Sequence, residues 1–304
     1  MKRARAARPG SPERHRRRLG TGQVVLLGWI GLALCGCDED APAAPSEERS
    51  TEAPLDPGIA RMVPEAEAAR DRAIEALLEE PELQAGELWV MQRVARVSGH
   101  DALGKRIPEW VDVARRKQPG RVVLVDPSAQ RPRVPEELSM GIFRLQEYLK
   151  ASYSDPPGVA LKLVREFLSQ PGEGYVATHQ LLTLIWWEEV RGTPVPRSRD
   201  DRRRLLDVLA RDQTEDSEFS DLYAERAFLL GFYGDACLAD LAEWARVTLD
   251  AQQGDGLWGE LEWTLEYDGV EYSSSSKKHT GVVGVGALQA FLDAAGDPSR
   301  RCGR

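Results

Sequence analysis

The chain has 304 residues, of which 49 are acidic and 40 are basic, so its formal net charge is −9. Residues 1–20 contain eight basic residues and one acid, and removing them leaves a net charge of −16. This excess of acid disfavours a nucleic-acid partner, because neutralising phosphates requires a basic face. The length suffices for one domain with a substantial core.

The N-terminal region combines a basic start with a short uncharged run. Residues 24–36 read VVLLGWIGLALCG, which is shorter than the roughly 20 residues that a membrane-spanning helix needs. A basic segment followed by a short apolar run is typical of a secretory signal. The run ends in Leu34-Cys35-Gly36-Cys37.

This ending resembles the lipobox of bacterial lipoproteins, in which an aliphatic residue and two small residues precede the lipid-bearing cysteine. Cys35 stands where alanine or serine is usual. The resemblance implies a signal peptide over residues 1–36, cleavage before Cys37 and lipidation of Cys37. The protein would then be exported and anchored through lipid to the bacterial cell envelope. The alternative is a chance cysteine in an ordinary signal peptide or in a short anchor.

The rest of the chain divides by composition. Residues 37–58 are rich in acid, alanine and proline without apolar periodicity, which predicts a disordered tether behind the lipid. We expect a helical repeat domain over residues 59–296 and a short tail over 297–304. Cys237 and Cys302 remain after processing, and such a pair in an oxidising compartment favours a disulfide that holds the tail.

The domain is predicted to be mostly α-helical. Apolar residues recur at helical spacing in ten segments: 61–80, 87–97, 107–117, 138–150, 159–168, 176–190, 201–210, 222–232, 237–251 and 280–294. A β-branched run over 121–125 predicts a short strand. Residues 263–267 and 270–274 flank Asp268-Gly269, whose two positions tolerate the turn of a β-hairpin.

An internal repeat runs through the second half of the domain. Each copy reads as a helix, a glutamine, an acidic or glycine-rich turn, an aromatic residue and a second apolar helix. Glycine permits a left-handed turn, glutamine bonds freed backbone groups, and an aromatic ring fills the gap between helices. These roles are structural whatever the function is. The copies hold Gln252, Gly256 and Trp258; Gln170 and Gly174, with Tyr175 one residue early; and Gln213 and Phe219.

The best copy resembles the Gln-x-x-x-Gly-x-Trp motif of the squalene cyclase and protein prenyltransferase superfamily. The resemblance covers roughly residues 159–294 and implies an α/α toroid of helical hairpins with one β-hairpin insert. The second helices of a toroid line a central cavity, which makes Tyr175 and His179 candidates for that cavity. A histidine at a helix start can instead be a cap. The alternative fold is an array of the TPR or HEAT kind.

A second resemblance concerns metal binding. Asp235 and Cys237, followed by His279, resemble the zinc ligands of the prenyltransferase β subunit, and a carboxylate, a thiolate and an imidazole form a sensible zinc site. Cys302 competes with this zinc site for Cys237. Glu260 with Glu262, or Asp255 with Glu260, are acid pairs suited to glycan cleavage, although an acid-rich chain contains such pairs by chance.

These observations favour an envelope lipoprotein whose toroid-like domain binds a ligand or a protein partner without catalysis. The first alternative is an enzyme that uses the toroid cavity, through zinc or through acid pairs acting on a glycan. The second is a helical adaptor within a larger envelope assembly.

Overall fold

The computed structural model describes residues 54–135, 137–259, 262–267 and 269–301. The predicted signal peptide, Cys37, most of the predicted tether and Cys302 therefore lie outside the described residues. Within the described ranges the chain forms ten α-helices, two 3₁₀ turns and two strands. In chain order these are α1 Pro57–Leu78, α2 Ala85–Ser98, α3 Asp101–Lys117, η1 Val122–Leu124, α4 Ile142–Ala151, α5 Pro157–Leu168, α6 Gly174–Arg191, α7 Arg199–Glu215, α8 Asp221–Tyr233, α9 Leu238–Asp250, β1 Glu262–Tyr267, β2 Val270–Ser275, α10 Lys277–Gly296 and η2 Pro298–Arg300.

Each predicted helical segment contains a helix, so the mostly helical class is confirmed. Several ends differ from the predicted ones. Helix α1 begins at Pro57, inside the predicted tether, because the Asp56 side chain accepts the backbone N–H of Gly58 at 2.7 Å and caps the first turn.

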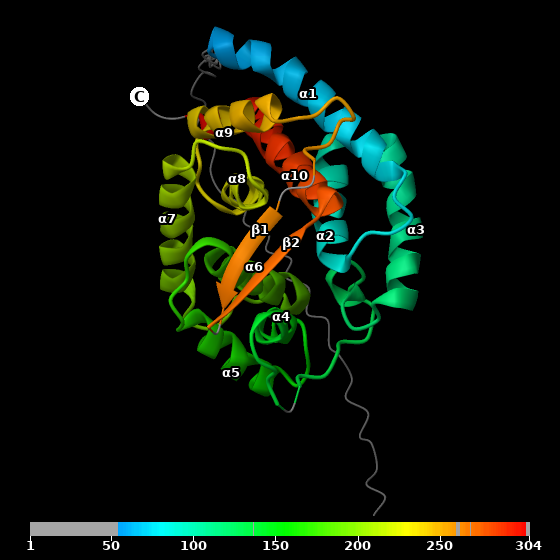
Figure 1. Ribbon diagram of the computed structural model, residues 1–304, viewed down its shortest axis with the longest axis vertical. Helices are drawn as coiled ribbons and strands as arrows, with labels where there is room; N and C mark the ends of the chain where they lie inside the picture. Colours follow the sequence, from blue (N-terminus) through cyan, green and yellow to red (C-terminus); the bar gives the residue numbers. More distant parts are fainter. Residues whose placement is uncertain (1–53, 136, 260–261, 268, 302–304) are drawn as a thin grey trace, which may run out of the picture. The chain divides into compact units, whose positions relative to one another are not determined.

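Helix α10 packs against four other helices, α1, α2, α8 and α9 (Figure 1). Glycines let these neighbours approach closely. A Cβ at Gly284 would lie 2.8 Å from the Trp258 ring, and a Cβ at Gly286 would lie 2.7 Å from the Phe228 ring. Substituting Gly286 would push α8 away from α10, and substituting Gly284 would displace the Trp258 ring in the turn after α9.

The best copy of the repeat motif is structural, as predicted. The Gln252 side-chain amide donates to the carbonyls of Ala69 and Gly256 at 2.7 and 2.8 Å, which joins α1 to the turn after α9. Gly256 has φ +86°, and a Cβ there would lie 2.9 Å from the Arg72 carbonyl. The Trp258 indole donates to the Thr248 carbonyl at 2.7 Å and is buried.

The glutamines of the weaker copies also serve structure. Gln170 accepts the Tyr267 hydroxyl at 2.8 Å, and Gln213 accepts the Arg226 guanidinium at 3.0 Å. Gly174 opens α6 with φ +50°. Phe219 stacks against Trp258 with ring centroids 6.0 Å apart.

The strand predictions have two outcomes. Strands β1 and β2 pair antiparallel, with Tyr267 opposite Val270, so the hairpin is present. The predicted strand at 121–125 is wrong, because Val122–Leu124 forms a 3₁₀ turn. Residues 122–125 are all buried, and in this turn the Val125 N–H bonds the Val122 carbonyl at 3.0 Å. Packing from several sides has overridden the β-branched preference.

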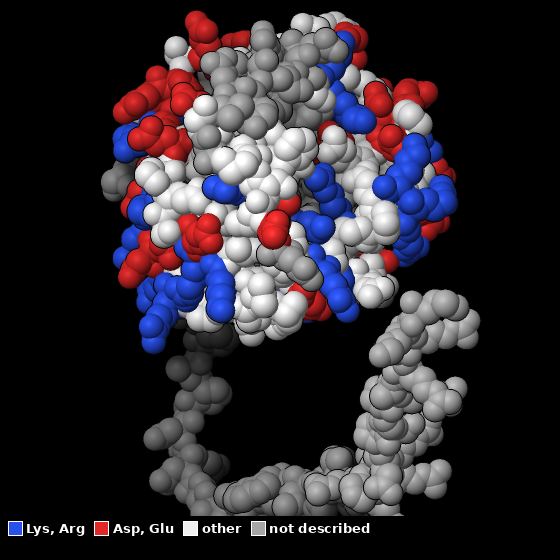
Figure 2. Space-filling view, turned by 60° about the horizontal axis from the view of Figure 1, so that its bottom comes forward, with Lys and Arg blue, Asp and Glu red and all other residues white. Residues whose placement is uncertain are grey.

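None of the helices in the described ranges combines the length and apolarity of a transmembrane span. On the face drawn in Figure 2, basic and acidic side chains form separate small groups beside uncharged surface.

Candidate ligand cavity and its carboxylate–imidazole cluster

A cavity of about 340 Å³ lies among the helices, and its wall follows a simple pattern. The lining side chains on α-helices come from α2, α4, α6, α8 and α10, whereas α1, α3, α5, α7 and α9 contribute none in the described part of the chain. Leu265 of β1 and Ser276, just before α10, complete part of the wall. Alternate helices therefore face the cavity, and the remaining helices lie outside them.

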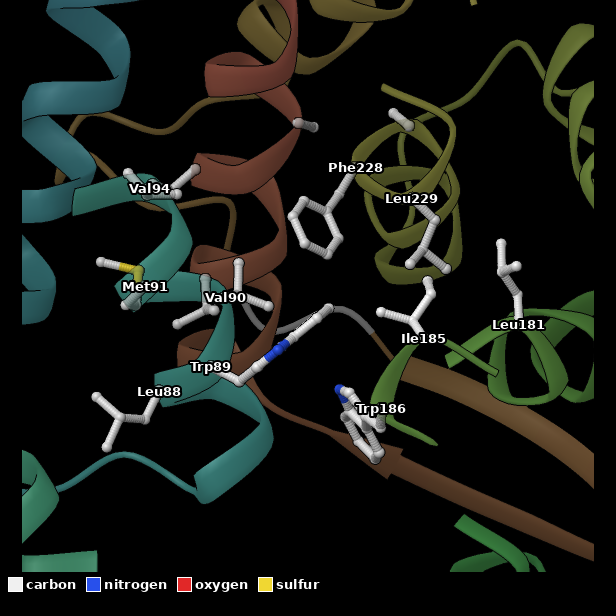
Figure 3. Close-up of a cluster of buried hydrophobic side chains, with 14 of the residues drawn as sticks. Leu88, Trp89, Val90, Met91, Val94, Leu181, Ile185, Trp186, Phe228 and Leu229 are labelled. Atoms are coloured by element: carbon white, nitrogen blue, oxygen red, sulfur yellow. The ribbon is translucent and has the colours of Figure 1, made fainter. Parts of the chain in front are cut away.

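One part of the wall is aromatic and aliphatic (Figure 3). Trp89 of α2 meets Trp186 of α6 edge-on at 5.8 Å and Phe228 of α8 edge-on at 5.9 Å. The Trp89 indole donates to Glu189 at 2.6 Å. The Trp186 indole N–H is buried without an acceptor among the described residues. The apolar wall thus contains one unsatisfied donor.

The polar part of the wall is centred on Asp221, the first residue of α8. One carboxylate oxygen accepts the Thr280 hydroxyl at 2.8 Å, and the other accepts the Tyr175 hydroxyl at 3.0 Å. Asp221 is 2% exposed. Burial and the neighbouring Asp221 charge raise the pKa of Tyr175, which keeps its hydroxyl protonated as a donor.

His279 lies between two carboxylates. Its Nε2 is 3.5 Å from Asp221, and its Nδ1 is 3.8 Å from Glu87 of α2. The cap residue Ser276 fixes the first turn of α10 by accepting the His279 backbone N–H at 3.1 Å. Glu87 accepts the Gln84 N–H at 2.7 Å in a capping box. Glu87 therefore has a structural role in addition to its place in the cavity wall.

Glu225 lies one turn after Asp221 and faces the same cavity. Burial raises the pKa of Glu225, and the nearby imidazoles of His179 and His279 oppose that rise. Burial also raises the pKa of Glu87 against the hydrogen bond from Gln84. Both carboxyl groups have been taken out of water, which disfavours their charged forms.

His179 lines the cavity from the second turn of α6. Its Nδ1 lies 2.7 Å from the Tyr175 carbonyl, which accepts a proton held on that nitrogen. The predicted cavity candidates Tyr175 and His179 both line this cavity.

The structure does not bring the predicted zinc ligands together. His279 contacts Asp221 at the start of α8, whereas Asp235 and Cys237 follow Tyr233 at its end. Helix α8 has 13 residues, which separates its ends by roughly 20 Å. Cys237 is moreover disulfide-bonded, and its predicted partner Cys302 lies outside the described residues. The Asp235, Cys237 and His279 triad is therefore wrong.

Of the predicted acid pairs, the structure describes the side chain of Asp255 alone. Asp255 is exposed and forms an ion pair with Lys277, which holds the pKa of Asp255 below its usual range. Glu260 lies outside the described residues, and so does the Glu262 side chain. No described residue of these pairs lines the cavity.

Sequence reasoning missed Asp221, Glu225 and Glu87. The available signal was charge placed inside apolar helices: DLYAERAFLL in α8 and ELWVMQ in α2. The spacing of Asp221 and Glu225 puts both on one face of a helix. The spacing does not tell whether that face of the helix is exposed to solvent or lines a cavity.

Compared with protein-family models, with curated proteins and with solved structures, the chain has no significant match.

Proposed function

We propose that this protein is an exported lipoprotein, anchored through Cys37, whose helical domain binds a small, largely apolar ligand in its central cavity. The observation that carries ligand binding is the cavity itself. Its volume of about 340 Å³ lies within the usual range for small-molecule sites, which are concave and mostly apolar with a few convergent polar groups.

We infer an α/α-toroid arrangement for this domain. The alternation of the helices supports it, because α2, α4, α6, α8 and α10 line the cavity and the other five do not. The structural roles of Gln252, Gly256 and Trp258 also support it. An open array would instead present a groove along one side.

The wall defines the chemistry of the ligand. Its apolar body would lie against Trp89, Trp186 and Phe228, where burial of aromatic or aliphatic surface supplies most of the affinity. Its polar end would lie at Asp221, Glu225 and His279. An acceptor on the ligand would also satisfy the Trp186 N–H.

A pair of substitutions at Gly86 tests binding. Gly86 lines the cavity, and a Cβ there would make ordinary contact, 3.8 Å from the Trp186 ring. Gly86→Ala keeps the cavity and favours α2, whereas Gly86→Leu fills it. We expect the full chain to bind the neutral dye N-phenyl-1-naphthylamine at one saturable site, with unchanged affinity in Gly86→Ala and at least tenfold weaker binding in Gly86→Leu. Equal binding by both variants would place the dye elsewhere.

The anchor is tested separately. Expression with radiolabelled palmitate should label the wild-type chain, and the protein should sediment with membranes. Cys37→Ser should abolish both labelling and cleavage, while Cys35→Ser should preserve both, because serine is usual at that position of a lipobox. Labelling of Cys37→Ser would exclude Cys37 as the lipid site.

Catalysis in the same cavity is the second candidate function, and the state of two side chains favours it. Burial raises the pKa of Glu225, which suits a proton donor, and His179 places an imidazole in the same cavity wall. Hydrolysis of p-nitrophenyl esters and glycosides by the full chain is the simplest assay. Activity that persists in Glu225→Gln and His179→Gln would exclude these roles.

A further inference from the structure

We propose that Asp221, Glu225 and His279 form a binding site for a divalent transition-metal ion at the polar end of the cavity. The site goes beyond the proposed function, because binding an apolar body against the tryptophans requires no metal. The three residues are the group of potential ligands that the fold brings together in the described part of the chain. One ligand atom from each lies within 4.8 Å of the others.

The first argument is uncompensated buried charge. Asp221 is 2% exposed, and Glu225 and Glu87 are each 5% exposed. Among the described residues, no lysine or arginine forms an ion pair with any of these carboxylates. The His279 imidazole lies beside Asp221 and Glu87, and the imidazoles of His179 and His279 lie near Glu225. Buried carboxylates are stable only when they are paired, protonated or bound to a metal.

The second argument is how the ligands are held. Asp221 receives hydrogen bonds from Thr280 and Tyr175, which fix its orientation. His279 turns Nδ1 toward Glu87 and Nε2 toward Asp221. A ligating histidine typically directs its second nitrogen at a carboxylate or carbonyl, which sets the tautomer and orients the ring. Glu87 is thus a positioning residue.

The third argument concerns the kind of ion. One imidazole nitrogen and two carboxylates suit Zn²⁺ and its transition-metal neighbours better than Mg²⁺ or Ca²⁺, which prefer all-oxygen sites. Three protein ligands leave positions open, and the three side chains line the cavity. An open position is typical of metals that hold or activate a bound molecule.

The test measures metal directly. The full chain, extracted in detergent, is stripped with a chelator and titrated with Zn²⁺ under equilibrium dialysis, with zinc counted by mass spectrometry. We expect one zinc per chain. Glu225→Gln and His279→Ala should each weaken binding at least tenfold, while Asp235→Asn, in the loop after α8, should bind as the wild type does. Co²⁺ should give a visible spectrum that His279→Ala changes.

A positioning role for Glu87 makes a separate prediction. Glu87→Gln should weaken zinc binding roughly 10- to 100-fold, while the metal-free variant melts no earlier than the wild type. A folded wild type without stoichiometric zinc would overturn the site, and so would zinc retained by Glu225→Gln. Because glutamine keeps the shape of glutamate, that variant decides the question even when His279→Ala does not fold. Dye binding at the apolar wall is scored independently of either result.

Discussion

Helix α8 carries two sets of buried charged side chains, which differ in their partners. Arg226 is paired within the chain, whereas Asp221 and Glu225 are not paired with a lysine or arginine of the described residues. Arg226 is 3% exposed and donates to Gln213 at 3.0 Å and to Asp216. Its charge is neutralised by the chain that precedes α8. Asp221 and Glu225 lie on the same helix, yet no described lysine or arginine pairs with them.

This difference separates a structural charge from a candidate site. Arg226 ties α8 to the end of α7, and Gln213 belongs to the repeat motif. Asp221 and Glu225 instead face a cavity, where a bound ligand or metal ion can supply the positive charge that no described lysine or arginine provides. Removing one partner of a buried charge that is paired within the chain destabilises the fold, whereas buried charge without a counter-ion in the chain marks a candidate functional site.

Removing Arg226, which pairs with Gln213 and Asp216, should have the largest effect on stability. Arg226→Met removes the guanidinium that Gln213 and Asp216 share, and leaves the buried Gln213 amide without a charged partner. We expect the free energy of unfolding in urea to fall by about 3 kcal/mol. Arg211→Met on the exposed side of α7 is the control and should leave the free energy of unfolding nearly unchanged, because water screens this exposed ion pair. Equal losses in the two variants would remove the special role of Arg226.

Substituting Glu225, one of the cavity acids, should change the free energy of unfolding in the opposite direction when metal is absent. In chelator-treated protein, Glu225→Gln removes a buried carboxylate that lacks a cation, and we expect roughly 1–3 kcal/mol of added stability at pH 7.5. In the presence of zinc the same variant should be less stable than the wild type, because it loses a ligand. Chemical denaturation with and without chelator measures both. A loss of stability in both conditions would make Glu225 a structural residue like Arg226.

The two sets should also differ in pH dependence. The folded-state pKa values of Glu225 and Glu87 lie above their unfolded values, so the folded state binds more protons over the interval between them. Stability of the metal-free protein should therefore rise as pH falls toward the ordinary glutamate pKa of 4.5, by up to about 1.4 kcal/mol per pH unit for each proton taken up. Glu225→Gln should flatten this slope, and Arg226→Met should not. If Glu225→Gln leaves the pH dependence of stability unchanged, then groups other than Glu225 take up these protons.

The sequence predicted what depends on local pattern. Apolar spacing indicated each helix, and Asp268-Gly269 indicated the hairpin. Gln252, Gly256 and Trp258 were interpreted as structural, and their hydrogen bonds and close contacts agree. These features follow from periodicity, turn conformation and the size of side chains, which adjacent residues largely determine.

What the sequence did not predict depends on contacts between distant segments. The run at 121–125 has strand-forming residues, but burial on several sides bends it into a turn. The zinc prediction placed Cys237 beside His279, because order along the chain does not tell which end of α8 meets α10. The acids that do meet His279 lie in α8 itself and in α2, and only the packing of the helices brings them together.

The smallest expected effect comes from the support of Asp221. Thr280→Val removes the hydroxyl that donates to Asp221 at 2.8 Å and preserves the shape of the side chain. The free energy of unfolding should fall by about 1 kcal/mol, and zinc affinity should fall several-fold because Asp221 loses one of its two donors.

Thr248→Val is the matched control for this change. Thr248 is equally buried, but its hydroxyl donates to the Trp244 carbonyl within α9, and Thr248 does not line the cavity. Its substitution should leave zinc affinity unchanged whatever it does to stability. A pair of titrations in which both variants weaken zinc equally would mean that affinity follows global stability. A loss confined to Thr280→Val would mean that the orientation of Asp221 controls the binding of the ion.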